Sequence, residues 1–485
     1  MDGRARIRGM RILLSCGVAG LLVVSLVAQE AVDTAVVARI RAEAFDRGRV
    51  LDTFSHLADV IGPRLTNSPA HKRAVAWTQE TLRGWGLANV HAEPFEFGRG
   101  WTLERFSVEM IEPRYMPLTG YPKGWSASTP GTVTATPVWL PDPSPADVQA
   151  RAGALAGAIV MTRPIQEYFI RADRPPASGD LRTGRPPAKP AMPPADLLAA
   201  LEREQVGVTL EPSIGEHGTI FVTGRDLGAN AIPAVVLASE HYNLVARLLQ
   251  QGIAVKLAVN VQGRYDESDR NTYNVMAEIP GTDPAVGSEV VMAGAHLDSW
   301  HSATGATDNA DGVATVMEAA RILQALGVRP KRTIRIALWA GEEQGLLGSR
   351  AWVGQHLEGD ANAAARDGLS VYFNFDNGYP PVTGFYMEGN EPAQRIVAAW
   401  LRPLADLGAT LTPSGGIGAT DHLSFKALGL PGFQAVQSYA GYDVRTHHTN
   451  ADFVERIEPE ALKQSAAVTA TVLYHAAMRD QKMPR

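Results

Sequence analysis

Cysteine is almost absent from this chain of 485 residues, since Cys16 is its one cysteine. Cys16 lies within an apolar run near the N-terminus, and the run continues past it, which does not fit a lipid-anchored cysteine. If this leader is removed, the mature protein contains no cysteine. Structural disulfide bonds, thiolate catalysis and zinc bound by sulfur are then excluded.

An excess of basic residues is also missing. The chain has 45 Lys and Arg against 51 Asp and Glu, a formal net charge of -6, and no basic stripe is visible, which argues against nucleic acid as the main partner. Hydrophobic residues make up 45% and charged residues 20%, a balance that excludes a disordered or fibrous chain. The length allows one large core and a second domain.

The first residues have the features of an export signal. An apolar run over residues 12–27 is too short and too rich in Gly and Ser for a good membrane span. We expect a signal peptide over residues 1–28, a secreted or periplasmic protein, and no stable membrane partner after cleavage. Leu26 fits the cleavage site poorly, and an uncleaved membrane anchor is the alternative. The basic residues before the run are Arg4, Arg6, Arg8 and Arg11.

The pattern of predicted elements changes along the chain. Residues 31–87 have apolar side chains at helical spacing. From about 117 to 265 the chain holds short β-rich pieces, including 219–223, and one or two helices, so we predict a small β-rich domain inserted into the main one. Within it, the proline-rich segment 171–195 is expected to be an exposed loop.

After residue 272, strand-like runs alternate with helical ones to the end of the chain. This alternation predicts an α/β sheet covered by helices. The final helix is expected over residues 459–478, with Pro459 at its first position.

Acidic and imidazole side chains follow the apolar strands of this second part. In open α/β sheets, ligands bind at the carboxyl ends of strands, which is where these side chains occur. Asp308 lies in a loop before the next predicted helix, and a histidine pair occurs near the C-terminus. The residues in question are His296, Asp298, Asp308, Glu342, Glu343, Asp376, His447, His448 and Asp452.

Each of these residues has a structural explanation when taken separately. One histidine after a strand is more often a loop residue than a ligand, and a Glu-Glu pair is usually solvated. Asp308 fits a helix cap, and Asp376 fits a turn. Together, however, they would have to meet at one sheet edge by accident, after runs too apolar for surface strands. The set therefore predicts a pocket for metal.

Imidazole and carboxylate ligands without sulfur suit Zn²⁺, and less well Mn²⁺ or Co²⁺. Five or so ligands exceed what one tetrahedral zinc needs. Two ions that share a bridging carboxylate fit better. In a Glu-Glu pair, one member can bind metal while its neighbour faces the metal-bound water as a base.

At these residues the chain resembles the M28 family of zinc metallopeptidases, which includes bacterial secreted aminopeptidases and the carboxypeptidase Q group. The resembling motifs are, in chain order, GAHLDSW, GATDNADGVA, WAGEEQGLLGS, FNFDNG and HHTNAD. Residues 117–265 resemble a protease-associated domain. The resemblance implies a three-layer α/β/α sandwich with a mixed, mainly parallel central sheet, formed by residues 31–116 and 266–480.

The resemblance also implies a role for each site residue. His296 and Asp376 would hold one zinc ion, and Glu343 and His448 a second. Asp308 would bridge the two ions, although Thr307 stands where many members have an aspartate. His448 is preferred to His447 because the family histidine precedes an aspartate by four residues, here Asp452. Glu342 would be the general base, and Asp298 would hold the ring of His296.

The implied activity is hydrolysis of short peptides by an aminopeptidase or dipeptidase with two Zn²⁺ ions per chain. Two alternatives share the scaffold: a one-zinc acyl transferase like the glutaminyl cyclases, and a non-catalytic homologue like the transferrin receptor. The complete set of ligands argues against both. Further candidates for the substrate pocket are Asp421, His422, Tyr442 and Arg445.

Overall fold

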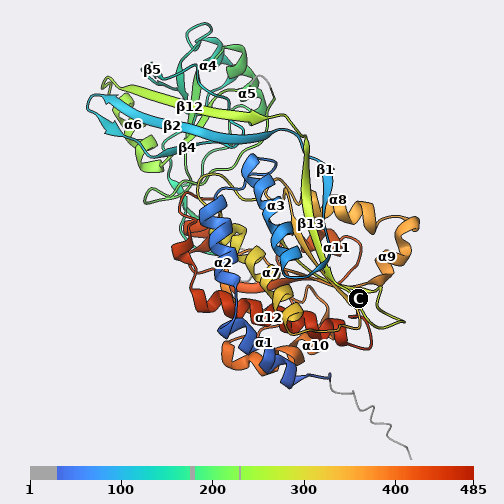
Figure 1. The fold of residues 1–485 in the computed structure, drawn as a ribbon. Coiled ribbons are helices and arrows are strands. Elements are labelled where there is room, and N and C mark those ends of the chain that lie inside the picture. The colour runs from blue at the N-terminus through green and yellow to red at the C-terminus, as the bar shows by residue number, and fades with distance from the viewer. Residues whose placement is uncertain (1–29, 175–180, 229–230) are drawn as a thin grey trace, which may run out of the picture.

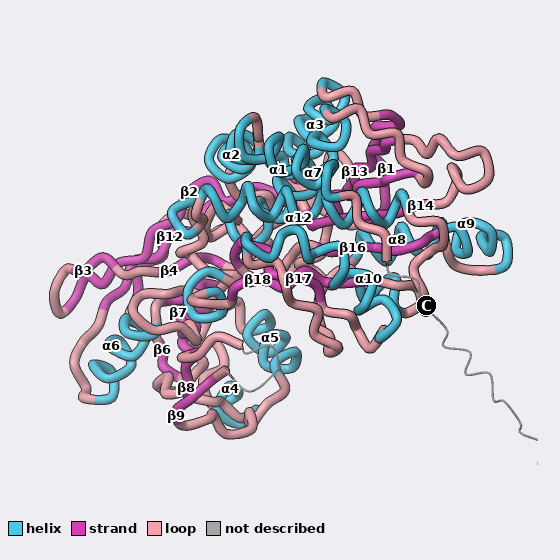
Figure 2. Tube along the Cα trace, turned by 90° about the horizontal axis from the view of Figure 1, so that it is seen from below, coloured by secondary structure: helices cyan, strands magenta, loops and turns pink. Residues whose placement is uncertain are grey.

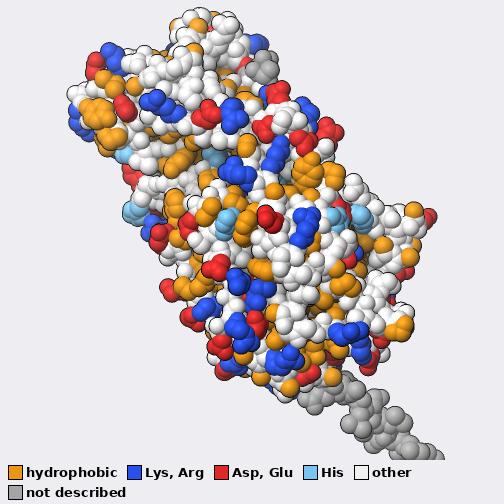
Figure 3. Space-filling view, in the orientation of Figure 1, with side chains coloured by type: hydrophobic (Ala, Val, Ile, Leu, Met, Phe, Trp, Pro, Cys, Tyr) orange, Lys and Arg blue, Asp and Glu red, His pale blue; other side chains and the backbone are white. Residues whose placement is uncertain are grey.

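The computed structural model describes residues 30–174, 181–228 and 231–485 (Figure 1). The signal peptide expected over residues 1–28 lies outside the described residues. Within these three ranges, no helix combines the length and apolar character that crossing a membrane requires. Figure 3 shows acidic and basic side chains interspersed over the visible face, without a basic stripe there.

A mixed sheet of seven strands forms the centre of the larger part of the described chain. Four adjacent strands of this sheet run parallel to one another, and the three remaining neighbouring pairs, two at one edge and one at the other, are antiparallel. The strands are, in spatial order, β1 (Ala88–Glu96), β13 (Asn271–Ile279), β15 (Thr333–Trp339), β14 (Val290–His296), β16 (Leu369–Asn374), β18 (Gly432–Ser438) and β17 (Tyr379–Phe385).

Both faces of this sheet are covered. Along β14, Val291, Ala293 and Ala295 join one hydrophobic core, whereas Met292 joins another on the opposite face, as the two-residue period of a strand requires. Because both faces are buried, the inner strands are nearly continuous apolar runs. The structure thus confirms the three-layer α/β/α architecture with a mixed sheet (Figure 2).

The helices on the first face of the sheet share one hydrophobic core. They are α1 (Thr34–Asp46), α2 (Val50–Ser55), α3 (Pro69–Gly84), α7 (Asp311–Ala325), α10 (Glu391–Leu401) and α12 (Pro459–Met478). The opposite face is covered by α8 (Leu347–His356) and α11 (His422–Lys426), and α9 (Ala363–Gly368) precedes β16. Helix α12 has the bounds that the sequence predicts.

The two ends of the described chain meet at α1 and α12. The backbone amide of Asp33, the N-cap of α1, donates to Nε2 of His475 at 3.1 Å. The hydroxyl of Tyr474 donates to the carboxylate of Asp33 at 3.1 Å. The N-terminal helix is therefore attached to the last helix of the main domain.

The helical region predicted over residues 31–87 is present but interrupted. A π-helical turn (His56–Ile61) extends α2, and residues 62–68 then run without helix before α3. The side chain of Ser68 caps α3 by accepting from the amide of His71 at 3.1 Å, with Pro69 at the first helical position.

Arg64 explains why the interruption is ordered. Its guanidinium is completely buried and donates to five backbone carbonyl oxygens at 2.9–3.1 Å. Burial lowers the pKa of Arg64 to about 10, so the group remains charged at neutral pH. These bonds attach the N-terminal segment to the loop that follows β14. The accepting residues are Leu57, Gly62, Leu297, Thr304 and Gly305.

Two smaller sheets, of four and five strands, form most of the upper part of the molecule in Figure 1, together with one two-stranded pair. One contains, in spatial order, β3 (Met116–Pro117), β2 (Gly100–Glu112), β12 (Lys256–Asp266) and β5 (Val133–Ala135). The other contains β4 (Gly120–Pro122), β11 (Ala234–Leu237), β10 (Val208–Pro212), β7 (Ile159–Met161) and β6 (Val138–Trp139). The accompanying helices are α4 (Pro145–Gln149), α5 (Pro194–Arg203) and α6 (Ser239–Gln250).

Strand β2 was not anticipated from the sequence, and it precedes residue 117. It pairs along its length with β12, so both long strands belong to the four-stranded sheet. The division of the chain at 117 and 265, and the likeness of that region to a protease-associated domain, stay predictions. We call the region that holds the two smaller sheets, residues 100–266, the upper region.

Two expectations for the upper region need correction. The segment 171–195 is mostly exposed loop where it is described, but β9 (Arg182–Gly184) pairs with β8 (Tyr168–Ile170), and α5 begins at Pro194. The run 219–223 is not a strand of either smaller sheet. Its residue Phe221 instead makes an isolated antiparallel bridge to Thr449. This apolar run of β-favouring residues therefore pairs with a loop of the main domain and not with a neighbouring strand.

His71 in α3 leads to a prediction about stability and pH. Its side chain is completely buried, and burial lowers its pKa from 6.5 to about 3, with a smaller effect of the nearby charges of Arg64 and Lys72. Below pH 6.5 this histidine takes up a proton in the unfolded chain, whereas in the folded protein it stays neutral down to about pH 3. Protonation therefore favours the unfolded chain, and the free energy of unfolding decreases as the pH falls from 6.5 towards 3.

We expect the unfolding free energy of the wild type, relative to that of His71→Leu, to fall by about 1.4 kcal/mol for each pH unit below 6.5. Urea unfolding of both proteins at pH 7.5, 6 and 5 measures this difference. The comparison with the variant cancels the other titrating groups. A difference that is independent of pH would contradict a neutral, buried His71.

Candidate metal centre

Four parallel strands bring the candidate ligands to one edge of the central sheet. Because β15, β14, β16 and β18 run in the same direction, their carboxyl ends lie side by side. His296 is the last residue of β14, and Asp376 follows β16 by two residues. The Glu342–Glu343 pair follows β15, and the loop after β18 carries His447 and His448.

The first group of contacts surrounds His296. Its Nε2 lies 3.1 Å from Oδ1 of Asp308 and 3.4 Å from Oδ1 of Asp376. All three side chains are buried. Burial acts to lower the pKa of His296, but the charges of Asp376 and Asp308 outweigh it and raise that pKa well above its usual value. Nε2 of His296 therefore lies close to one oxygen of Asp308 and to one oxygen of Asp376.

The second group surrounds His448. Its Nε2 lies 2.9 Å from Oε2 of Glu343 and 3.4 Å from Oδ2 of Asp308. Burial raises the pKa of Glu343 to about 7, with a further contribution from the charge of Asp308. Against the effect of burial, Glu343 and Asp308 raise the pKa of His448 to about 9. Asp308 thus presents one carboxylate oxygen to each group.

The donor set fits divalent cations. Within the described part of the chain, four of its buried atoms make no hydrogen bond of good geometry: His296 Nε2, Asp308 Oδ2, and both carboxylate oxygens of Glu343. Three of them, all but Oε1 of Glu343, have only the ion-pair contacts described above. Leaving such atoms unpaired costs roughly 1–3 kcal/mol each, so buried polar atoms normally have a partner. Possible ligand atoms of His296, Asp308 and Glu343 lie within 4.8 Å of one another, as do those of His296, Glu342 and Asp376. Imidazole nitrogen with carboxylate oxygen is the chemistry that zinc accepts.

Asp298 anchors this arrangement in two ways. Its backbone oxygen lies 2.9 Å from Nδ1 of His296, whereas its carboxylate is farther from that nitrogen, at 3.7 Å. The carboxylate instead accepts from the backbone amides of Glu342 and Glu343, each at 3.3 Å, and from the hydroxyl of Thr66 at 2.8 Å. Asp298 therefore fixes the turn of the glutamate pair as well as facing the histidine ring.

Glu342 is placed differently from its neighbour. It belongs to the group with His296 and Asp376 and has no ion pair among the described residues. Burial raises the pKa of Glu342 well above its usual value, and the charges of Asp376 and Asp421 add to this effect. A carboxylate of raised pKa beside a metal site is suited to accept a proton near neutral pH.

Asp452 has a role that sequence reasoning missed. Its carboxylate accepts from the backbone amide of Thr307 at 2.7 Å and from that of Asp308 at 3.2 Å. Asp452 thereby holds the backbone that presents Asp308. Its position at the end of the HHTNAD motif was the available signal, although the sequence alone does not indicate the distant loop that it binds.

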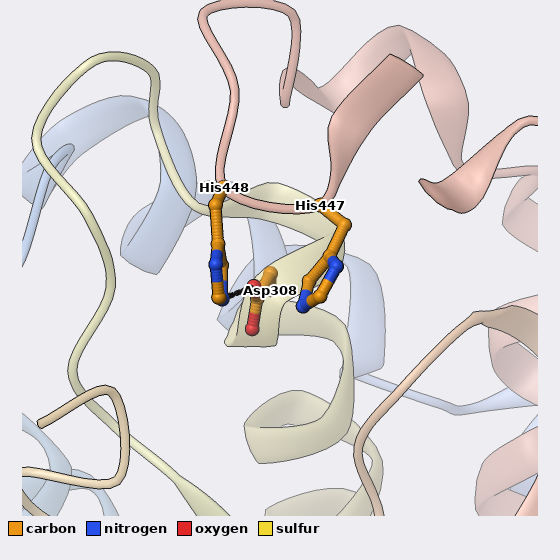
Figure 4. Close-up of side chains that lie close together, drawn as sticks. All are labelled: Asp308, His447 and His448. Atoms are coloured by element: carbon orange, nitrogen blue, oxygen red, sulfur yellow. Dashed lines mark ion pairs between the residues drawn. The ribbon is translucent and has the colours of Figure 1, made fainter. Parts of the chain in front are cut away.

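His447 and His448 flank Asp308, as Figure 4 shows. Their rings are 3.9 Å apart, and the ring of His447 also stacks on Tyr442 at 5.0 Å. His448 makes the contacts with Glu343 and Asp308, which favours it as the ligand of this pair. Possible ligand atoms of His447, His448 and Asp308 nevertheless lie within 4.8 Å of one another.

The remaining candidates lie around this centre with different surroundings. Asp421 is buried, and burial raises its pKa to about 7, with further effects of nearby charges that include Asp376. Nε2 of His422 contacts Glu388 at 3.2 Å, so the histidine is engaged outside the ligand groups. Tyr442 is buried beneath the ring of His447, and Arg445 is half-buried on the same loop.

Comparison with known proteins gives a consistent result. Residues 274–473 match the family model described as peptidase family M28. Carboxypeptidase Q from Bos taurus is 28% identical over 440 residues, which cover 90% of this chain and 87% of the relative. Carboxypeptidase Q from Homo sapiens is 27% identical over 460 residues, covering 95% and 90%.

Solved structures extend the similarity to three dimensions. A peptidase M28 precursor from Shewanella amazonensis SB2B is 26% identical, with a TM-score of 0.70, and the alignment covers 93% of this chain and 98% of that one. A zinc aminopeptidase from Bacillus subtilis is 20% identical, with a TM-score of 0.59 and coverage of 90% and 96%, a likeness that concerns the fold.

Proposed function

The chain belongs to peptidase family M28 and is a metallopeptidase, and on that premise we propose that it is a secreted two-zinc exopeptidase acting on short peptides. The observation that carries the proposal is the placement of Asp308. One of its oxygens faces His296 and the other faces His448, as expected of a carboxylate that bridges two ions. His296 and Asp376 would complete one metal position, and Glu343 and His448 the other.

Zinc bound in such a site polarises a substrate carbonyl and lowers the pKa of a bound water. Glu342, held by the contact between its amide and Asp298, accepts the proton of the attacking water. The water oxygen first adds to the peptide carbonyl carbon. The C–N bond then breaks as Glu342 passes the proton to the amine nitrogen, so that the amine leaves in neutral form.

Export is part of the proposal. The basic and apolar N-terminal residues have the pattern of a signal peptide, and the similar solved protein from Shewanella amazonensis is itself described as a precursor. A protein without cysteine after residue 16 also needs no disulfide chemistry outside the cell.

A one-zinc acyl transferase is the alternative that the contacts disfavour. Such a site needs one of the two groups of ligands, whereas both are complete around Asp308. Two zinc ions per purified chain support the peptidase, and one tightly held ion supports the transferase.

A peptide-digestion experiment tests the proposed activity. The purified protein, with zinc and with chelator, is incubated with one hexapeptide in three forms: free, N-terminally acetylated and C-terminally amidated. We expect residues to be released stepwise from one end, loss of cleavage with chelator, and recovery with added zinc. The blocked form that resists digestion identifies the end that is recognised. Absence of chelator-sensitive cleavage in all three forms would contradict the proposal.

A further inference from the structure

The loop that carries His448 is bonded to the upper region through its backbone. The amide of Val222 donates to the carbonyl of His448 at 3.0 Å, and the amide of Asn450 donates to the carbonyl of Ile220 at 3.2 Å. The amide of Ile220 donates in turn to the side-chain oxygen of Asn450 at 2.7 Å. Residues 220–222 therefore act as a short strand against residues 448–450.

His448 needs this support because of its backbone conformation. Its φ is 60°, in the left-handed region that residues other than glycine adopt at an energetic cost. Such a conformation persists where the surroundings determine it strongly. Here the hydrogen bond from Val222 holds the backbone of His448 itself. The two hydrogen bonds between Ile220 and Asn450 hold the chain two residues after it.

A second contact from the upper region holds the other half of the same loop. The carboxylate of Asp173 accepts from the backbone amides of Gly441 at 2.7 Å and Val444 at 3.1 Å. The guanidinium of Arg174 forms a forked pair with Asp443, at 2.9 Å from Nε and 2.7 Å from Nη2. Asp443 is almost completely buried, so this pair is strongly shielded from water.

Arg174 also connects the two ligand groups. Its Nη1 donates to the side-chain oxygen of Asn377 at 3.2 Å, and Asn377 directly follows the candidate ligand Asp376. One arginine of the upper region thus spans the loop after β16 and the loop after β18. We call residues 173–174 and 220–222 the bracing segments.

We propose that the bracing segments position His448 and thereby set the affinity of the metal position formed by Asp308, Glu343 and His448. The upper region is then a structural component of the metal centre, and Asp173 and Arg174 are positioning residues that act through the loops they contact. This inference rests on the proposed function, since it requires a metal ion beside His448. Partners that orient a ligand from outside typically contribute ten- to a hundredfold to metal affinity.

Zinc binding to matched variants tests the proposal. Asp173→Asn weakens the contact to Gly441 and Val444. The double variant Arg174→Gln/Asp443→Asn removes the forked pair without leaving one buried charge unpaired. The control is Arg171→Gln/Glu216→Gln, which removes a forked pair of the same chemistry (2.6 and 2.7 Å) three residues away on the surface.

Competition with a chelator of known affinity gives the dissociation constant of each bound zinc. We expect the weaker-bound zinc of both test variants to have a dissociation constant raised about ten- to a hundredfold, and the control to match the wild type. Hydrogen exchange of peptides covering 441–450 should be faster in the test variants, while melting temperatures of the zinc-loaded proteins with excess zinc stay close to that of the control. Excess zinc should also restore their peptidase activity.

Two outcomes separate this inference from the proposed function. A wild type that binds two zinc ions, with test variants that hold both as tightly as the control, would overturn the bracing role and leave the peptidase intact. A wild type that binds no zinc would overturn the proposed function, and the bracing role with it. If zinc binding is weakened equally in the control variant, general destabilisation of the fold accounts for the effect, and the proposal is also overturned.

Discussion

The variant Glu342→Gln is expected to bind zinc as the wild type does and to lose about 10²- to 10⁴-fold in kcat, the usual contribution of a general base. The amide of glutamine occupies the same space as the carboxylate but accepts no proton at neutral pH. The backbone amide of residue 342, which contacts Asp298, is unchanged by the substitution. The loss should therefore affect turnover rather than folding or metal content.

The neighbouring glutamate supplies the control for this experiment. Glu343→Gln replaces a group whose Oε2 lies 2.9 Å from Nε2 of His448, so we expect it to lower the zinc content. Metal analysis and peptidase rates, measured on both variants in parallel, distinguish a base from a ligand. A rate near that of the wild type for Glu342→Gln would overturn the assignment of Glu342 as the base.

The variant Asp308→Asn is expected to have the largest effect on metal content. The asparagine side chain offers one carbonyl oxygen in place of two carboxylate oxygens, and it carries no charge between the two histidines. We expect the zinc content to fall from two ions to at most one per chain. Activity should fall by more than the ten- to hundredfold typical of residues that support ligands from outside.

Asp376→Asn is the matched comparison, because Asp376 faces His296 and belongs to one group. We expect it to weaken one zinc ion and leave the other bound. Metal analysis after gel filtration and the shift in melting temperature on adding zinc provide two readouts, since a ligand of the folded state raises its stability. Two firmly bound zinc ions in Asp308→Asn would contradict the bridging role.

Sequence reasoning succeeded where the structure is governed by local chemistry. Helical spacing over residues 31–87 predicts helices there, and α3 begins at Ser68 and Pro69 by local chemistry, since the capping side chain and the amide that donates to it lie within one turn. His296 and the Glu342–Glu343 pair reach one edge because each follows an apolar strand, and parallel strands align their ends. These conclusions require no knowledge of distant partners.

Sequence reasoning failed where a residue contacts another residue that is far away in the sequence. Arg174 and Asp443 are separated by 269 residues, and the proline-rich segment that contains Arg174 gives no sign of the loop it binds. Phe221 lies in an apolar run that looked like a sheet strand, yet it pairs with Thr449 in the loop that carries His448.

The attachment of α1 to α12 has a consequence for biosynthesis. Asp33 and His475 are 442 residues apart, so this contact forms only after nearly the whole chain has been made. The inner parallel strands likewise need partners that emerge at different times, and such non-local contacts form slowly. The main domain therefore cannot complete its packing until α12 has been synthesised, so the order in which its parts are made delays the last step of its folding.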